Sequence, residues 1–274
     1  MPWRQERFRV RDGLSLLVRI CTPDAPIPAK TLLVIHGGCE HGGRYTHVVE
    51  RFASRGWTSV IADHRGHGES EGTPMDVPSI EAYLDDLREI CEHYCTNGPP
   101  VLLGHSFGGL LAIRLIETGL CARAAVLSAP FLGLSLRVPW WKYWLARGLR
   151  WIAPRARFRT GLDINNMTRD PEFLALRRAD KLIQKRVTVR WFFAAQYGLI
   201  LAHRDADKIT CPVLALQGLD DRTVSPEALR RWWPLVRSEN KVLWEFPGHV
   251  HEMLFDSDWQ ILTDRIADWL ETLD

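Results

Sequence analysis

Residues 101–109 read VLLGHSFGG, and this stretch leads into the helical pattern LLAIRLIE at 110–117. A short apolar strand, a glycine-flanked serine and a helix form the context in which Gly-x-Ser-x-Gly presents a nucleophile. Glycine is needed at 104 and 108 because side chains two residues from the serine would collide in so tight a turn. The stretch therefore predicts Ser106 as a nucleophile at the end of a strand, with the first amides of the next helix pointing toward any anion beside it.

The rest of the chain alternates between strand and helix patterns. The apolar runs that fit buried strands are TLLVIH (31–36), WTSVIAD (57–63), ARAAVLSAP (122–130), CPVLALQG (211–218) and KVLWEFPG (241–248). Apolar residues at helical spacing predict helices at 79–94, 110–117, 226–237 and 259–273. Ahead of these elements, RFRV and LSLLVRI flank Asp12-Gly13, which predicts a hairpin with a tight two-residue turn. Such alternation implies the α/β class, a mostly parallel sheet with helices on both faces.

The stretch 131–207 interrupts this alternation. It is rich in arginine and tryptophan and helical in pattern, and it lies between two sheet strands. We therefore interpret it as a helical cap inserted into a core made of residues 1–130 and 208–274. Its first cationic residues are Arg137, Lys142, Arg147, Arg150, Arg155, Arg157 and Arg159. Such a run is either a solvated face or a surface that meets anionic lipid.

Composition excludes several classes of protein. With 274 residues, of which 46% are hydrophobic, the chain has enough apolar surface for one sizeable core. Lys and Arg number 35 and Asp and Glu 33, so the net charge of +2 gives no reason to expect nucleic acid as a partner. The six cysteines contain no C-x-x-C pair and are expected to be buried free thiols. The first residues lack a signal-peptide pattern and no apolar run is long enough to span a bilayer, so we expect a cytoplasmic protein.

A serine nucleophile needs a base to accept its proton and an acid to orient that base, here expected in the chain order Asp and then His. Asp220 and Asp221 both follow the strand run that ends at residue 218. We favour Asp221 as the acid and expect Asp220 to cap or solvate the turn. His249 and His251 both follow the last strand run. We favour His251 as the base and expect His249 to contact solvent or backbone.

The turn after TLLVI supplies the second half of the expected oxyanion hole. It reads His36-Gly37-Gly38-Cys39-Glu40, and glycine at 38 lets the backbone approach a substrate closely. The amides of Gly38 and Phe107 are therefore the predicted pair of oxyanion donors. The remaining histidines near glycines are interpreted as structural; they are His36, His64, His67 and His105. The chain has no H-x-x-x-H or H-E-x-x-H pair, so we expect neither a metal nor a cofactor.

Six segments occur in an order that resembles a known family. They are HGGCEHGGRY (36–45), ADHRGHGESEG (62–72), GHSFGG (104–109), SAP (128–130), QGLDDRTV (217–224) and FPGHVHE (246–252). Together they resemble the monoacylglycerol lipase and lysophospholipase branch of the α/β-hydrolases, often labelled serine aminopeptidase-like. The resemblance covers about 30–130 and 210–270 and implies an α/β-hydrolase fold.

The resemblance also bears on the two open choices. In the family that the sequence resembles, the acid falls three residues after a glycine, which selects Asp221. The histidine of the family falls three residues after the glycine of a Pro-Gly pair, which selects His251. The oxyanion amides of the family match Gly38 and Phe107. Methionine usually follows the nucleophile in this family, and the ring of Phe107 is expected to narrow the pocket. No dedicated site for a substrate α-amino group is visible, which argues against aminopeptidase activity.

The residues and the resemblance lead to the same expected activity. We expect a serine carboxylic-ester hydrolase that forms an acyl-enzyme on Ser106 and acts on small lipophilic monoesters, foremost monoacylglycerols. Alternatives are a lysophospholipase or a broad carboxylesterase or thioesterase. A non-catalytic ligand-binding homologue is a further alternative, which the intact Ser, Asp and His set opposes.

The tryptophans of 131–207 have two alternative roles, lining an acyl tunnel or packing the cap on the core, and we favour packing for most of them. They are Trp140, Trp141, Trp144, Trp151 and Trp191. Aromatic and basic residues are interleaved in VPWWKYWLARGLRW (138–151). This pattern suggests that the cap makes peripheral contact with a membrane or micelle.

Overall fold

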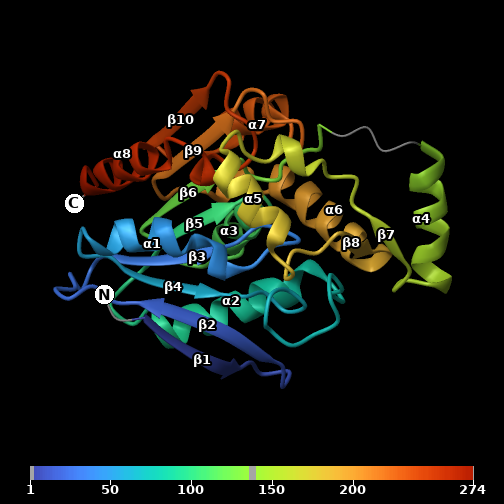
Figure 1. The fold of residues 1–274 in the computed structure, drawn as a ribbon, viewed down its shortest axis with the longest axis horizontal. Coiled ribbons are helices and arrows are strands. Elements are labelled where there is room, and N and C mark those ends of the chain that lie inside the picture. The colour runs from blue at the N-terminus through green and yellow to red at the C-terminus, as the bar shows by residue number, and fades with distance from the viewer. Residues whose placement is uncertain (1–2, 136–139, 274) are drawn as a thin grey trace.

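The computed structural model describes residues 3–135 and 140–273, which build one eight-stranded sheet with helices on both faces (Figure 1). The strands are β1 (Trp3–Arg9), β2 (Ser15–Cys21), β3 (Thr31–Ile35), β4 (Thr58–Ala62), β5 (Val101–His105), β6 (Ala124–Ser128), β9 (Val213–Gly218) and β10 (Lys241–Phe246). Their order in the sheet is β1-β2-β4-β3-β5-β6-β9-β10. β2 runs antiparallel to β1 and β4, and the other neighbouring pairs are parallel. The predicted α/β-hydrolase fold is confirmed.

The N-terminal hairpin turns over three residues, so the predicted two-residue turn is wrong. The N–H of Val10 donates to the carbonyl of Leu14 at 3.0 Å, and the N–H of Gly13 donates to the carbonyl of Val10 at 2.8 Å. Gly13 has φ +93°, whereas Asp12 is not among the residues with positive φ. The tight turn typical of Asp-Gly needs positive φ at both central residues, and Asp12 does not supply it.

Two hydrophobic layers sandwich the sheet. On one face α1 (Thr46–Ala53) and α8 (Trp259–Glu271) pack against strand residues such as Leu32 and Val34. On the other face α2 (Ile80–Tyr94), α3 (Phe107–Glu117) and α7 (Pro226–Trp232) pack against residues such as Leu33 and Ile35. Consecutive side chains of a strand point to opposite faces, so one buried run supplies both layers. Four of these five helices were predicted from the sequence, and α1 was not.

Between β6 and β9, the described residues 129–135 and 140–212 form three α-helices and a small sheet. The helices are α4 (Trp140–Ile152), α5 (Pro171–Ala179) and α6 (Val189–Arg204), and the sheet pairs β7 (Arg157–Arg159) with β8 (Arg186–Thr188). Short 3-10 helices occur here and elsewhere at Gly42–Tyr45, Ile164–Asn166, Ala206–Lys208, Trp233–Leu235 and Met253–Phe255. The inner side of α6, at residues such as Ala195 and Ala202, joins the hydrophobic layer that contains α3. α6 thus packs against the helices that cover the sheet, while α4 lies at the outer edge of the molecule (Figure 1).

The tryptophans of α4 do not pack the insertion on the core, contrary to our expectation. Trp140, Trp144 and Trp151 are exposed, and Trp151 and its neighbour Ile152 keep more than four fifths of their surface, at 81% and 82%. The guanidinium of Arg147 lies 5.2 Å from the centre of the Trp144 ring. Arg137 and the side chain of Lys142 lie outside the described residues.

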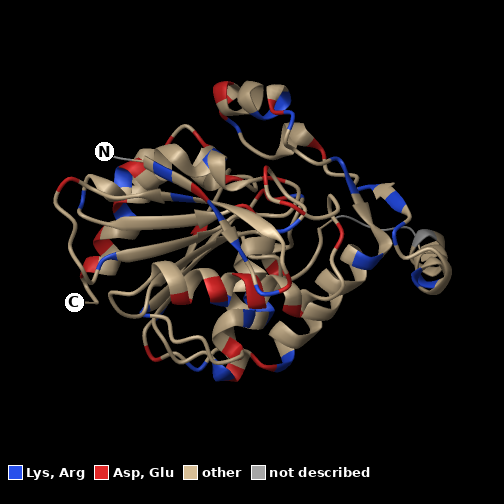
Figure 2. Cartoon of the chain, turned by 90° about the horizontal axis from the view of Figure 1, so that it is seen from below, with Lys and Arg blue, Asp and Glu red and all other residues tan. Residues whose placement is uncertain are grey.

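Charges of both signs are interspersed over the outer helices and loops (Figure 2). The six cysteines are free, but only four of them are buried, because Cys121 is exposed and Cys211 half-buried. Among the helices of the described residues, none combines the length and the apolar character that crossing a membrane requires.

Candidate active site

Ser106 lies in the turn between β5 and α3, where its backbone has the unusual angles φ +52° and ψ −116°. The turn is fixed on both sides, because the N–H of Ser106 donates to the carbonyl of Ser128 and its carbonyl accepts from the N–H of Phe131, both at 2.9 Å. A non-glycine residue holds such a conformation only where its surroundings enforce it, and such residues cluster at active sites. The side chain of Ser106 is half-exposed at the carboxyl edge of the sheet.

The glycines around Ser106 make this turn possible. A Cβ added at Gly104 would lie 2.5 Å from the carbonyl oxygen of Gly108, and one added at Gly108 would collide with the carbonyl oxygen of Ile35. At Gly109 it would lie 2.9 Å from the Cβ of Pro130. Side chains at these positions would push the helix and the serine away from the strand end.

The structure brings Ser106, His251 and Asp221 into one hydrogen-bonded chain. His251 Nε2 lies 3.0 Å from Ser106 Oγ, and His251 Nδ1 lies 2.7 Å from Asp221 Oδ2. An ionised carboxylate only accepts hydrogen bonds, so Nδ1 carries the imidazole proton and Nε2 offers a lone pair to the serine hydroxyl. Asp221 Oδ1 in turn accepts from the backbone N–H groups of Thr223 and Val224, at 2.7 and 3.0 Å.

These contacts set the charges of the pair. Burial by itself would raise the pKa of Asp221, but His251 and the two backbone donors outweigh it and lower the pKa. Burial would lower the pKa of His251, but the Asp221 carboxylate outweighs it and raises the pKa. Asp221 therefore stays ionised, and His251 is made a stronger base than an isolated histidine.

Asp220 and His249, the two candidates that were not favoured, lie apart from the hydrogen bonds that join Ser106, His251 and Asp221. Asp220 is exposed, and its backbone N–H donates to the carbonyl of His249 at 2.9 Å. His249 does not end in solvent or on the backbone alone, contrary to expectation, because its Nε2 lies 2.9 Å from Asp258 Oδ2. His249, Asp256 and Asp258 form a group whose possible metal-binding atoms lie within 4.8 Å of one another. Arg169 Nε already pairs with Asp256 at 2.7 Å, which places a cation beside this group.

Gly38 and Phe107 lie next to each other beside Ser106. A Cβ added at Gly38 would lie 3.4 Å from the Cβ of Phe107. The carbonyl of Gly37 accepts from His36 Nδ1 at 2.8 Å, and in a planar trans peptide the N–H of Gly38 then points the opposite way. Phe107 is the first residue of α3, where backbone amides have no acceptor within the helix. These contacts leave both amides as the predicted oxyanion donors.

The four histidines interpreted as structural are buried. His36 Nε2 accepts from the N–H of His64 at 2.9 Å, and His105 Nδ1 contacts the carbonyl of Ser128 at 3.1 Å. Burial, reinforced by neighbouring histidines, lowers the pKa of His36 and His64, and burial lowers that of His67 to about 4. None of these contacts involves the hydroxyl of Ser106.

A cavity of about 510 Å³ opens at Ser106, Gly38 and Phe107. Its walls come mainly from apolar side chains of the inserted stretch, among them Trp141, Leu145, Leu149, Phe158, Trp191 and Phe192. The Trp191 ring lies 5.0 Å from that of Phe107, centre to centre, so these two rings of the cavity lining are in contact. Arg159, Thr160 and Gln196 are polar groups in the same lining.

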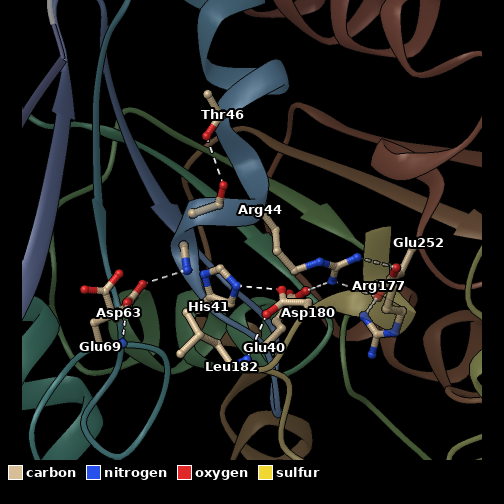
Figure 3. Close-up of polar contacts among 12 residues, drawn as sticks. Glu40, His41, Arg44, Thr46, Asp63, Glu69, Arg177, Asp180, Leu182 and Glu252 are labelled. Atoms are coloured by element: carbon tan, nitrogen blue, oxygen red, sulfur yellow. Dashed lines mark hydrogen bonds and ion pairs between the residues drawn. The ribbon is translucent and has the colours of Figure 1, made fainter. Parts of the chain in front are cut away.

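Sequence reasoning missed four charged residues beside the site whose side chains are buried, namely Glu40, Arg44, Arg177 and Glu252 (Figure 3). A signal for three of them existed. Glu40 and Arg44 stand four residues apart in the segment that holds Gly38, and Glu252 directly follows His251. Arg177, from α5, had no such signal.

Comparison with known proteins shows the family of the chain. Residues 26–258 match the family described as "Serine aminopeptidase, S33". Phospholipase YtpA of Bacillus subtilis is 31% identical over 82% of this chain and 89% of its own, and the monoacylglycerol lipase of Mycolicibacterium smegmatis is 29% identical over 94% and 93%. The crystal structure of Paleococcus ferrophilus monoacylglycerol lipase superimposes with a TM-score of 0.85 at 29% identity, covering 94% of this chain and 99% of that one. The chain therefore belongs to the serine aminopeptidase S33 family and is a monoacylglycerol lipase-like ester hydrolase of the α/β-hydrolase fold.

Proposed function

We propose that this chain hydrolyses lipophilic monoesters, foremost monoacylglycerols, through an acyl-enzyme on Ser106. The observation that carries the proposal is the nucleophile at the mouth of an apolar cavity, with Ser106 Oγ 3.0 Å from His251 Nε2. Relatives named monoacylglycerol lipase support this substrate class.

In the proposed reaction, Ser106 Oγ attacks the ester carbonyl carbon while His251 Nε2 accepts its proton. The N–H groups of Gly38 and Phe107 bind the oxygen that becomes negative, and Asp221 stabilises the imidazolium. His251 then gives its proton to the leaving alcohol as the C–O bond breaks, which leaves the acyl group on Ser106. Water repeats the sequence and releases the carboxylic acid.

The substrate class is tested by rates against acyl length. We expect monoacylglycerols with long chains to be cleaved with higher kcat/KM than short p-nitrophenyl esters, because each buried methylene adds apolar contact with the cavity. A fluorophosphonate probe is expected to label Ser106, and prior incubation with a monoacylglycerol should slow the labelling. Failure of the probe to react would leave only the non-catalytic ligand-binding alternative.

A second substrate class is favoured by Arg159, which is among the residues that line the cavity, and by the relative named phospholipase. A guanidinium at this place suits the phosphate of a lysophospholipid. Lysophosphatidylcholine belongs in the same series, with Arg159→Gln alongside. If Arg159→Gln selectively lost the hydrolysis of lysophosphatidylcholine, the result would favour the hypothesis of a lysophospholipase over that of a monoacylglycerol lipase.

The rate is expected to fall on acidification, with a midpoint above the ordinary histidine pKa of 6.5. His251 must be neutral to accept the serine proton, and Asp221 raises the pKa of His251. Activity is therefore present above the folded-state pKa of His251 and lost as the pH falls through it. The measurement is kcat/KM from pH 5 to 9 at constant ionic strength. A midpoint below 6.5 would contradict the assignment of His251 as the base.

We also propose that 131–207 acts as a cap over Ser106 and rests on anionic lipid through α4. Exposed Trp144, Trp151 and Ile152 alternate there with Arg147 and Arg150, the arrangement of helices that lie in a membrane interface. The proposed location is the cytoplasm, which suits the free thiols.

Retention on vesicles of anionic lipid at low salt is the expected result of this contact. Replacing Trp151 and Ile152 by serine should release the protein, since both side chains are more than 80% exposed and have little to lose in the folded chain. Ile261→Ser is the matched control. Ile261 is also an exposed apolar residue, at 66%, but it lies on α8, which covers the sheet and is not part of 131–207. Equal retention of both variants would overturn the proposed contact.

A further inference from the structure

Four buried charged side chains form one connected cluster beside the active site, Glu40, Arg44, Glu252 and Arg177 (Figure 3). Arg44 donates to Glu252 through Nη1 at 3.0 Å and Nη2 at 2.8 Å, and it also contacts Glu40. Arg177 contacts the same carboxylate of Glu252 from the other side. Two carboxylates thus meet two guanidiniums, so the cluster is neutral although it is shielded from water.

One end of the cluster holds the turn that carries Gly38. Glu40 Oε1 accepts from the backbone N–H of Gly37 at 2.6 Å and from the hydroxyl of Tyr45 at 2.8 Å. The carbonyl of Gly37 is held by His36, as described above. Both sides of the residue before Gly38 are therefore fixed, and with them the direction in which the Gly38 amide points.

The other end holds the loop that carries His251. Glu252 is the next residue, its backbone N–H donates to the carbonyl of Met167 at 2.7 Å, and its carboxylate is divided between Arg44 and Arg177. Met167 and Arg177 both belong to the inserted stretch. The backbone beside the base is therefore fixed partly by the core and partly by the insertion.

The insertion also reaches the Gly38 turn directly. His41 Nε2 lies 2.8 Å from Asp180 Oδ2, just after α5, and the carbonyl of Cys39 accepts from the N–H of Gln184 at 2.8 Å. Figure 3 shows His41 and Asp180 beside the four-residue cluster. The α5 region thus contacts both loops that complete the site around Ser106.

We propose that Arg177 is a positioning residue by which the inserted stretch holds His251 and the Gly38 turn in their reactive arrangement. The inference rests on the proposed function of Ser106 and names the part of the insertion on which that chemistry depends. Arg177 touches no reacting atom and acts through Glu252. Its loss leaves Glu252 with both hydrogen bonds from Arg44, so the fold has a remaining partner for the buried carboxylate.

The test compares Arg177→Met with Arg178→Met on a soluble p-nitrophenyl ester. Arg178 is the next residue of α5, but it is exposed, and within the described part of the chain its hydrogen bond goes to the Asn165 side chain on the surface. We expect kcat to fall about tenfold in Arg177→Met with KM unchanged, since displacements of less than 1 Å in an active site already cost rate. Arg178→Met should match the wild type. Equal kcat in the two variants, or a change confined to KM, would overturn the proposal.

A pH profile supplies a readout that a purely structural role would not move. His251 faces Asp221, Glu252, His105 and Arg177, and the Arg177 cation lowers the pKa of His251. Removing it should move the acidic limb of kcat/KM to higher pH in Arg177→Met, while Arg177→Lys keeps the charge and should leave the limb in place. An unmoved limb in Arg177→Met contradicts the proposal.

Arg177→Lys also covers the case in which Arg177→Met does not fold. Lysine lacks the planar fork of arginine, so kcat should still fall about threefold against Arg178→Lys, at unchanged melting temperature. No fall would reject the positioning role. An inactive wild type would instead reject the proposed function, so the two failures are distinguishable.

Discussion

Ser106→Ala is expected to lower kcat by about 10⁵- to 10⁶-fold while leaving the fold intact. The hydroxyl forms its hydrogen bond with His251 and the turn itself is held by backbone contacts, so alanine removes the nucleophile and little else. The measurement is single-turnover hydrolysis of a monoacylglycerol together with the melting temperature. A rate within tenfold of the wild type would remove Ser106 from the reaction.

Ser128→Ala is the matched control for this experiment. Ser128 is a buried serine at the end of the neighbouring strand β6, and its Oγ has no partner among the described residues. Only its backbone carbonyl contacts the Ser106 turn, and alanine keeps that carbonyl. Loss of activity in this variant as well would point to damage of the turn instead of loss of the nucleophile.

Asp221→Asn is expected to lower kcat by about 10⁴-fold with the geometry preserved. The Oδ1 position receives two backbone N–H groups at 2.7 and 3.0 Å, so the asparagine oxygen will take it. The amide NH₂ then replaces Oδ2, the atom that lies 2.7 Å from His251 Nδ1. A donor at that place drives the imidazole proton to Nε2, and His251 no longer has a lone pair for the serine hydroxyl.

Asp220→Asn separates the tautomer effect from a general loss of charge. Asp220 is the adjacent residue in the same loop but is exposed, so the kcat of the Asp220→Asn variant should match that of the wild type. A crystal structure of Asp221→Asn or its reaction with fluorophosphonate would report whether the site is still assembled. A loss of less than 100-fold in Asp221→Asn would show that His251 does not depend on this carboxylate for its tautomer.

Most of the fold was predictable because its signals are local. The runs that became β3, β5 and β9 are continuous and apolar, and they end in turns rich in glycine and aspartate, so type and boundary appear together in the sequence. β7 and β8 were not predicted, because three residues such as Arg157–Arg159 carry no readable periodicity. The exposed tryptophans of α4 were misjudged because amphipathic spacing alone does not say what covers the apolar side.

The candidate site likewise contains residues that local patterns predict and contacts that they do not. Ser106, Asp221 and His251 follow strand ends, so their meeting is a consequence of parallel strands sharing one edge. The contact of Arg177 with Glu252 joins residues 75 positions apart in elements whose relative placement no local pattern gives. The resemblance selected His251 over His249, but the contact of His249 with Asp258 joins residues whose proximity no local pattern gives.

The place at which residues 131–207 leave the sheet has a consequence for how the molecule can be altered. They follow β6 and precede β9, which are neighbours in the sheet, and β6 also pairs with β5, the strand that ends just before Ser106. Because the chain leaves and re-enters the sheet between adjacent strands, a change of length in this stretch requires no change in the strand order. The cavity walls that it supplies can therefore vary over one and the same sheet, whereas the contact of Arg177 with Glu252 ties α5 to the loop that follows β10.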